Sequence, residues 1–335
     1  MQTLLVGYKA ADLFEEGKHG KRFTAPWAGG DGVLCHTLDI YHRHAIEKTH
    51  HIKTVCAPHL PEPPGGGKWD LVKFRTGPKL MPGELSLDLL QEIHLLGPKR
   101  FELDFCGRER DRNDLLAKIR DDPGRVRDFR ARWKASVPGG DEMEFTSVPG
   151  CFCHRRCDPG GLALAEVASR ELAASGAGSS APRILDMGCG CGLVGFLVAG
   201  ALRKATGRAP DLVMVDSHAR AVEAARINSE AFGINAEIIL ADNGTPERMD
   251  GSFDVFLGNP PYYSDYRIAD VFLETAARAL KPGGICYTVV KTATGLKGVQ
   301  ERHIGEAEVV PRRGYAVLKG RKHEGDSEDG AATRR

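Results

Sequence analysis

The chain has 335 residues, of which 41% are hydrophobic, so it can bury a substantial core and is long enough for two medium-sized domains. Its formal net charge is +1, which excludes binding of nucleic acid through overall charge and leaves local basic patches for such contacts. Nine cysteines in a chain of this length favour reduced thiols over a disulfide scaffold.

The N-terminal segment carries acidic residues early and has no long apolar core. This composition argues against a secretory or organellar leader, and no apolar stretch reaches transmembrane length. We therefore expect a soluble, cytoplasmic protein that is a monomer or a homodimer and has no membrane partner.

Residues 1–138 are predicted to form a first domain. Its first 60 residues contain no glycine-rich turn of the nucleotide-binding kind, so we expect this domain to capture substrate or to support the second one. Its histidine-rich stretch at 42–51 is typical of a polar helix face. A proline and paired glycines within 136–145 mark the domain boundary.

An arginine-rich run spans residues 99–134. One interpretation is a pair of solvated helices with ion pairs between residues three or four apart. The other is an RNA contact, in which Phe129 and Trp133 stack on bases. The run itself does not decide between them.

A cysteine cluster follows the boundary: Cys151, Cys153, His154 and Cys157 lie within seven residues. Four soft ligands so close together are compatible with zinc or an iron–sulfur site, to which Cys106 is a further candidate ligand. The single residue between Cys151 and Cys153 is tighter than a usual zinc knuckle, and no second pair is evident. We therefore expect these residues to form a loop, with no metal.

The second domain is expected at 143–321, and the polar tail at 322–335 is expected to be disordered. From residue 183 onward, short apolar runs alternate with helical patterns, as in RILDM, VGFLVAGALRKA, DLVMVD and AVEAARINSEAF. This alternation predicts an α/β fold with a mainly parallel, Rossmann-like, doubly wound sheet.

Candidate cofactor-binding residues lie where three of these strands end. A glycine-rich turn after the first strand lets the backbone approach a ligand closely, and an acid after the next strand suits the two ribose hydroxyls. A dinucleotide such as NAD is recognised in a similar way, so the turn alone does not identify the cofactor. The residues are Asp186, Gly188 and Gly190 at the first strand, Asp216 at the second, and Asp242 and Asn243 at the third, where they suit an adenine edge.

The tetrapeptide Asn259-Pro260-Pro261-Tyr262 ends the fourth strand and is the most specific signal. The prolines fix the backbone and remove two N–H donors, which leaves the Asn259 amide oxygen and the Pro260 carbonyl as acceptors facing one pocket. A planar amine fits between them, and accepting its hydrogens directs the nitrogen lone pair at an electrophile. Tyr262 offers a ring for stacking a base or an amide.

Together, GCGCG, VMVD, AD and GNPPYY make residues 183–320 resemble class I S-adenosylmethionine (SAM)-dependent methyltransferases. This resemblance implies SAM as the cofactor, held also by Asn259, and a nitrogen acceptor. Two flanking segments, VPGCFCHRRCDPGGLALAE and LPEPPGGGKWDLVKFRTGPK, resemble the ribosomal RNA (guanine-N2)-methyltransferases of the small-domain class. In that family the first domain is a degenerate α/β methyltransferase-like unit.

The same resemblance makes Phe152 and Asp158 candidates to line the site, and Tyr263 a substrate-binding candidate beside Tyr262. It implies catalysis by Asn259, Pro260 and Tyr262 on guanine N2 of ribosomal RNA, with a ribosomal subunit as possible partner. Tyr262-Tyr263 stand where those enzymes usually carry Phe-His, which keeps adenine N6 and protein glutamine open as acceptors. A non-catalytic RNA-binding scaffold is the remaining alternative.

Overall fold

The computed structural model describes residues 1–16, 22–25, 27–120, 127–175, 181–261 and 266–323. Contacts divide the chain into two compact units. The first contains Met1–Arg130 with the short segments Val148–Cys151 and His218–Arg220, and the second contains the remainder. No helix in the described ranges is long and apolar enough to cross a membrane.

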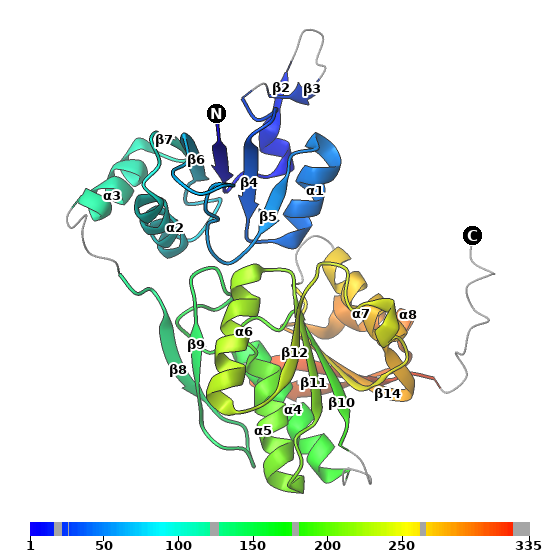
Figure 1. The fold of residues 1–335 in the computed structure, drawn as a ribbon. Helices are drawn as coiled ribbons and strands as arrows, with labels where there is room; N and C mark the ends of the chain where they lie inside the picture. The colour runs from blue at the N-terminus through cyan, green and yellow to red at the C-terminus, as the bar shows by residue number, and fades with distance from the viewer. Residues whose placement is uncertain (17–21, 26, 121–126, 176–180, 262–265, 324–335) are drawn as a thin grey trace. The chain divides into compact units, whose positions relative to one another are not determined.

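The first unit is built on a parallel sheet with the order β5-β4-β1-β6-β7. Leu4 and Val6 on β1 face the helix α2, whereas Leu5 between them faces α1, because successive side chains of a strand point to opposite faces. Its elements are β1 (Thr3–Val6), the 3-10 helix η1 (Ala10–Leu13), β2 (Phe14–Glu16), β3 (Arg22–Thr24), β4 (Val33–Thr37), α1 (Ile40–His50), β5 (Thr54–Cys56), β6 (Leu71–Thr76), α2 (Gly83–Leu96), β7 (Phe101–Phe105) and α3 (Glu109–Arg120) (Figure 1).

The histidine-rich stretch forms α1, as predicted, but one of its histidines is part of the core. His50 is buried, and its ring nitrogens lie 2.8 Å from Thr24 Oγ1 and 2.7 Å from the Ala10 carbonyl. Its ring also packs on Phe14 at 4.5 Å between centroids. These two hydrogen bonds and the ring contact give His50 a structural role.

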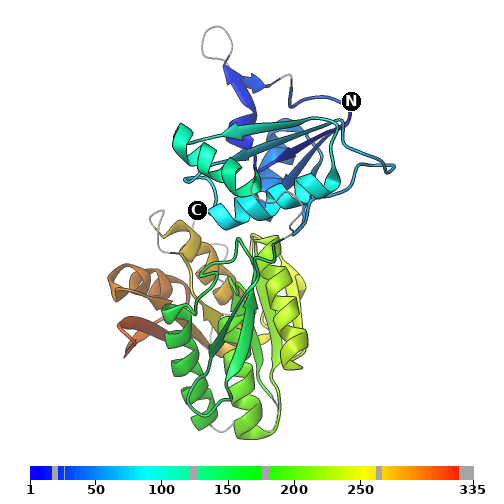
Figure 2. The same cartoon turned by 90° about the vertical axis from the view of Figure 1, so that its left-hand side faces the viewer.

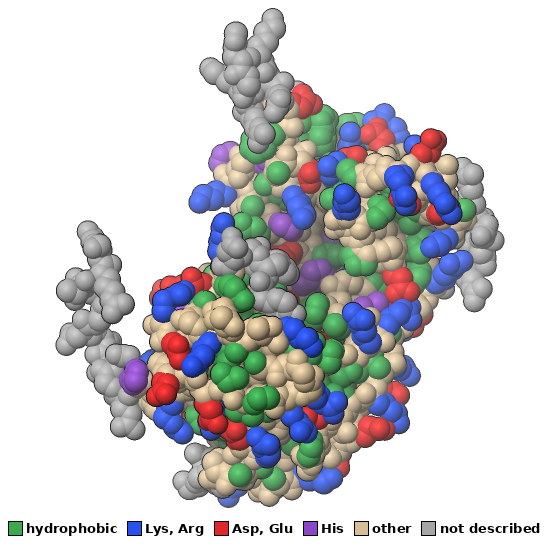
Figure 3. All heavy atoms as spheres, turned by 180° about the vertical axis from the view of Figure 1, so that it is seen from behind, with side chains coloured by type: hydrophobic (Ala, Val, Ile, Leu, Met, Phe, Trp, Pro, Cys, Tyr) green, Lys and Arg blue, Asp and Glu red, His purple; other side chains and the backbone are tan. Residues whose placement is uncertain are grey.

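The arginine-rich run differs from the pair of helices considered above. Within its described residues it forms β7, the single helix α3 and a strand, β8 (Ala131–Ala135). Ion pairs such as Arg108–Asp111 and Arg112–Glu109 lie at three-residue spacing in and beside α3. On the face drawn in Figure 3, Lys and Arg side chains are interspersed with acidic ones, in keeping with the small net charge.

The second unit is built on a seven-stranded sheet with the order β12-β11-β10-β13-β14-β16-β15. The first five of these strands are parallel, and β16 is antiparallel to both of its neighbours. Its elements are β8 (Ala131–Ala135), β9 (Met143–Ser147), α4 (Pro159–Ala174), β10 (Arg183–Met187), α5 (Leu193–Thr206), β11 (Asp211–Asp216), α6 (Ala219–Phe232), β12 (Ala236–Leu240), the 3-10 helix η3 (Glu247–Met249), β13 (Phe253–Gly258), α7 (Arg267–Ala279), β14 (Leu280–Val290), α8 (Ala293–His303), β15 (Ala307–Arg312) and β16 (Tyr315–Arg321) (mostly labelled in Figure 1 and seen from a second side in Figure 2). The predicted α/β, Rossmann-like fold is confirmed.

Helices cover both faces of this sheet. Leu185 and Met187 on β10 belong to a core cluster with α7 and α8, whereas Asp186 points to the other face, where its carboxylate bonds to α5. The helix α4 packs beside α5 on that second face. Both faces of the central strands are therefore buried, as a parallel sheet requires.

The second unit starts at Ala131, before the boundary expected within 136–145. The reason is that the proline and glycines used as boundary markers form the turn between β8 and β9, where Gly139 has a positive φ of 83°. Trp133 on β8 stacks on Phe145 of β9, with 4.9 Å between the ring centroids and 15° between the planes. One face of the half-buried Trp133 ring is therefore used in packing within the hairpin.

Asn228 on α6 attaches the β8–β9 hairpin to the rest of the unit. Its side chain is fully buried, accepts a hydrogen bond from the Thr146 N–H (2.8 Å) and donates to the carbonyls of Thr146 and Cys191 (both 2.9 Å). One amide thus satisfies backbone groups from two segments that are far from α6 in sequence.

Replacing Asn228 with alanine is expected to lower the free energy of unfolding by about 2–4 kcal/mol, because it leaves three backbone groups without their partner. Urea unfolding followed by tryptophan fluorescence measures this. The exposed Asn235 in the same unit is the matched control, and Asn235→Ala should leave the midpoint nearly unchanged. Equal effects of the two variants would show that Asn228 is not an anchor.

Candidate active site

A glycine-rich turn joins β10 to α5 at the carboxyl edge of the parallel strands. Gly188, Gly190 and Gly192 all have positive φ values, of 69°, 57° and 89°. The Gly188 N–H donates to the Val215 carbonyl of the neighbouring strand at 2.8 Å. Positive φ is strained for residues with a Cβ, so glycine at these positions permits the turn.

The three glycines differ in what surrounds them. A Cβ at Gly188 would lie 2.6 Å from the Phe272 ring, and one at Gly192 would lie 2.3 Å from the Phe196 ring. At Gly190, by contrast, a Cβ would meet nothing within 4 Å, so this residue faces open space. Phe272, which no sequence motif indicated, therefore forms one wall of the turn.

Asp216 at the end of β11 lies directly beside this open space. Its Oδ2 accepts a hydrogen bond from the Gly190 N–H at 2.8 Å, and the residue is half-buried. A carboxylate and an open backbone face thus lie next to each other. Asp216 can accept hydrogen bonds from hydroxyl groups of a bound molecule there, because a carboxylate has several lone pairs.

Asp186 lies beneath the turn. It is 2% exposed, and its Oδ2 accepts a hydrogen bond from the Gly195 N–H in the first turn of α5 at 2.8 Å. Burial raises the pKa of Asp186 to about 7. The carboxyl group therefore holds the start of α5 in position below the open face of the turn.

Asp242 and Asn243 follow β12 at the same edge of the sheet. Asp242 is half-buried and Asn243 is exposed. The next residue, Gly244, has a φ of 88°, and a Cβ there would lie 2.3 Å from Thr275 Oγ1. The close packing of Gly244 fixes the path of the chain just after these two polar side chains.

Asn259 and Pro260 follow β13, at the centre of the same edge. The Asn259 Nδ2 donates a hydrogen bond to Asp158 Oδ2 at 2.7 Å, between residues 101 positions apart. Because the nitrogen side of the amide is engaged, its oxygen is the group left to accept a donor. Pro260 is buried, which fixes the backbone beyond Asn259.

Asp158 has a second function in the fold, as the N-cap of α4. Its carboxylate accepts hydrogen bonds from the N–H groups of Gly161 at 2.7 Å and Gly160 at 3.3 Å. One carboxylate therefore connects the start of α4 with the Asn259 amide. The resemblance placed Asp158 near the site, but no local pattern in the sequence links it to Asn259.

Of the aromatic residues predicted for the site, Phe152 is 73% exposed in the loop before α4. A large apolar ring so open to solvent is available to stack on a ligand. Tyr262 and Tyr263 lie outside the described residues.

The side chains of the cysteine loop contact different partners. Cys153 Sγ lies 3.9 Å from Asp158 Oδ1, Cys157 Sγ lies 3.8 Å from the Asp158 carbonyl, and His154 Nδ1 lies 2.9 Å from Ser147 Oγ. Burial, and secondarily the Asp158 charge, raises the pKa of the Cys157 thiol to about 11. Within the described ranges, no three His, Cys, Asp or Glu side chains come together in a metal-binding arrangement.

At the corresponding edge of the first unit, side chains fill the space after the central strand. A Cβ at Gly7 would lie 2.3 Å from the Arg75 carbonyl, and the Arg75 guanidinium lies over the Tyr8 ring. Arg75 also pairs with Asp12 and Asp104. The end of β1 is thus covered by the protein's own side chains, unlike the end of β10.

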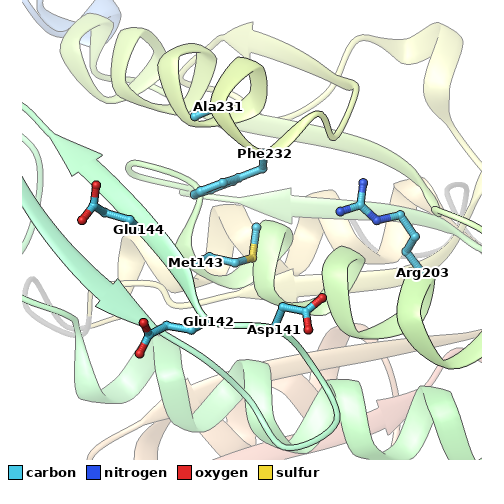
Figure 4. A pocket seen from close by; sticks show the side chains of 7 residues that line it. All are labelled: Asp141, Glu142, Met143, Glu144, Arg203, Ala231 and Phe232. Carbon is cyan, nitrogen blue, oxygen red and sulfur yellow. The ribbon is translucent and has the colours of Figure 1, made fainter.

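A cavity of about 390 Å³ in the second unit lies elsewhere, next to the β8–β9 turn and the C-terminal ends of α5 and α6. Figure 4 shows the Phe232 ring above the Met143 side chain, with Arg203 to one side. These helix ends lie away from the carboxyl edge, because α5 starts there and runs to the opposite edge. The remaining lining residues are Asp141, Glu142, Glu144 and Ala231.

Known proteins similar to this chain were found by sequence. Ribosomal RNA small subunit methyltransferase C of Pseudomonas aeruginosa (strain UCBPP-PA14) is 31% identical over 195 residues, which cover 56% of this chain and 54% of that protein. Ribosomal RNA large subunit methyltransferase G of Streptomyces avermitilis is 30% identical over 246 residues, 66% of this chain and 58% of that protein. The chain thus spans little more than half the length of these relatives.

A solved structure is similar over nearly the whole chain. The T. thermophilus 16S rRNA N2 G1207 methyltransferase (RsmC), in complex with AdoMet and guanosine, superimposes with a TM-score of 0.73 over 96% of this chain and 88% of that one, at 18% identity. This likeness establishes the fold. In addition, residues 142–319, more than half of the chain, match the family model described as methyltransferase small domain. The chain therefore belongs to the methyltransferase small-domain family.

Proposed function

We propose that this chain is a SAM-dependent N-methyltransferase that acts on an exocyclic base amine of RNA, with guanine N2 of ribosomal RNA as the acceptor. The observation that carries the proposal is the hydrogen bond from Asn259 Nδ2 to Asp158, which leaves the amide oxygen to accept a donor beside Pro260. A cytoplasmic location is part of the same proposal, since ribosomal RNA is the proposed acceptor.

The carboxyl edge of the second unit fits SAM as the cofactor. The open face of Gly190 next to the Asp216 carboxylate suits a ribose, and Gly188 allows close approach of an amino-acid portion. We assign the adenine to Asp242 and Asn243, and a further cofactor contact to Asn259. Asp186 supports the turn from below. A sulfonium cofactor bound there supplies an activated methyl group.

The acceptor amine is placed by the protein rather than activated by a strong base. The Asn259 amide oxygen and the Pro260 carbonyl accept its two hydrogens, which directs the nitrogen lone pair at the methyl carbon. Tyr262 and Tyr263 are proposed to stack on the base, together with the exposed Phe152. The proton leaves to solvent after transfer.

The choice of RNA is supported by the relatives, two of which are named as methyltransferases of ribosomal RNA, one of the small and one of the large subunit. The T. thermophilus enzyme with a similar fold was solved with guanosine. Adenine N6 or a protein glutamine is the second candidate acceptor, favoured by Tyr262-Tyr263 after the prolines.

Transfer of a tritiated methyl group from SAM onto total RNA and, in parallel, onto total protein tests this proposal. Nucleoside analysis of the labelled RNA should give N2-methylguanosine. Label in N6-methyladenosine would identify adenine instead of guanine as the acceptor base. Label in protein alone would identify a protein glutamine, and not RNA, as the acceptor. SAM binding without transfer to either would favour the non-catalytic scaffold.

Asn259→Ala is expected to lower kcat by about 100-fold or more, because the amine loses its positioning, with a much smaller effect on SAM affinity. Asp158→Ser keeps an N-cap on α4 but removes the carboxylate that holds Asn259. The kcat of this variant should therefore also lie below that of the wild type. If Asp158 acts through Asn259, the double variant is no slower than Asn259→Ala alone.

Asp39→Ser is the matched control for this pair, because Asp39 is the N-cap of α1 and accepts a hydrogen bond from the Tyr41 N–H. It should change thermal stability as Asp158→Ser does and leave kcat unchanged. Additive losses in the double variant would show that Asp158 does not act through Asn259.

Asp216→Ala is expected to raise the SAM dissociation constant about 10- to 100-fold, because hydrogen bonds to a charged group contribute about 1.5–3 kcal/mol. Isothermal titration calorimetry measures this directly. Asp211→Ala, at the opposite and exposed end of β11, is the control. An unchanged constant for Asp216→Ala would refute the ribose contact.

A further inference from the structure

Three cationic side chains gather beside Asn259 in the second unit and have no role in the mechanism above. Lys291 follows β14, and Arg312 and Arg313 lie at the turn between β15 and β16. Val290 pairs with Ala316, and Arg312 pairs with Tyr315, so this turn lies at the carboxyl edge of the parallel strands. We name these three residues the cationic cluster.

A series of close contacts connects the cationic cluster with Asn259. Asp158 accepts a hydrogen bond from Asn259, and Gly160 follows Asp158 in the first turn of α4. The Tyr315 ring lies so close to Gly160 that a Cβ there would meet it at 3.2 Å. The Lys291 Nζ in turn lies 4.4 Å from the centroid of the Tyr315 ring. The cluster is therefore next to the acceptor side of the site.

A buried carboxylate fixes the two arginines of the cluster. The Glu166 side chain on α4 is 3% exposed and receives hydrogen bonds from Arg312 and from both Nε (2.9 Å) and Nη2 (2.7 Å) of Arg313. Burial alone would raise the pKa of Glu166, but the two guanidinium groups hold it below its usual value. The side chains of Arg312 and Arg313 are nevertheless 41% and 47% exposed.

The balance of charge in the cluster is positive. Three cations against Glu166 and the nearby Asp158 leave an excess of one positive charge. The hydrogen bonds that Asp158 accepts from Asn259 and from the start of α4 come from neutral N–H groups, so they do not cancel its charge. Within the described residues, no carboxylate lies within salt-bridge distance of Lys291, whose ammonium group contacts the Tyr315 ring.

We propose that Lys291, Arg312 and Arg313 bind the phosphate backbone of the acceptor RNA next to the methylated base. This inference rests on the proposed function. It identifies a contact that an RNA acceptor would make and a protein acceptor would not. Guanidinium groups held in a fixed orientation match phosphate oxygens in two-point contacts, and a lysine adds a point charge. Phosphate contacts fix the register of a nucleic acid, while Asn259 contacts the base itself.

Lys291→Ala in the full-length chain tests the proposal. The dissociation constant for a fluorescein-labelled fragment of small-subunit ribosomal RNA, measured by anisotropy at several salt concentrations, should rise several-fold. The slope of log affinity against log salt should decrease by about 0.7 for a lost phosphate contact on a single strand. SAM affinity should stay unchanged.

Lys281→Ala is the matched control, because Lys281 lies on the same strand, β14, at its opposite end, where it pairs with Asp254 at 2.7 Å. It should leave the salt slope unchanged. Glu166→Gln is a second test that keeps all three cations while removing their counter-charge. It should tighten RNA binding, whereas a purely structural cluster would lose thermal stability with no gain in affinity.

Equal salt slopes for the wild type and Lys291→Ala would overturn the phosphate contact. If the wild type methylates RNA in that case, the proposed function stands and only this inference fails. If the wild type binds SAM and neither binds nor methylates RNA, both fail together.

Discussion

Parallel strands end at the same edge of a sheet, and the candidate site of this chain depends on that constraint. The helices α5 and α6, and the segment that contains η3, return the chain between β10, β11, β12 and β13, so the residues after each strand lie at one edge. The glycine turn, Asp216, Asp242 and Asn259 all lie at this edge, although β11 and β12 come between β10 and β13 in the sequence. The same edge receives the β15–β16 turn, because β16 runs antiparallel to β14.

A single carboxylate then connects the two halves of the proposed chemistry. Asp158 holds the first turn of α4 and the amide nitrogen of Asn259, so the loop before α4 and the end of β13 are fixed to each other. In the proposed reaction, such a fixed amide positions the amine, and no group of unusual basicity is needed. Gly160, in that same turn of α4, contacts Tyr315 and so brings the cationic cluster beside the acceptor side.

The two units share a parallel α/β sheet and differ in what lies at its edge. In the second unit the turn after β10 leaves open space at Gly190. In the first unit the corresponding position after β1 is Gly7, which packs against the Arg75 backbone, while Tyr8 and Arg75 pack over the end of the sheet. A similar strand order is therefore compatible with a cofactor site in one unit and with packed side chains in the other, since side chains and not topology decide the free volume.

The sequence by itself determined the α/β fold of residues 183–320, because alternating apolar runs and glycine turns are local patterns with a fixed structural meaning. It also indicated the glycine turn, Asp216 and Asn259, which directly follow predicted strands. The second unit starts at Ala131, earlier than the sequence suggested, because a β-hairpin turn and a domain linker use the same residues. Only the tertiary structure decided that Asp158 holds Asn259 and that Glu166 holds Arg312 and Arg313, since these contacts join residues more than 100 positions apart.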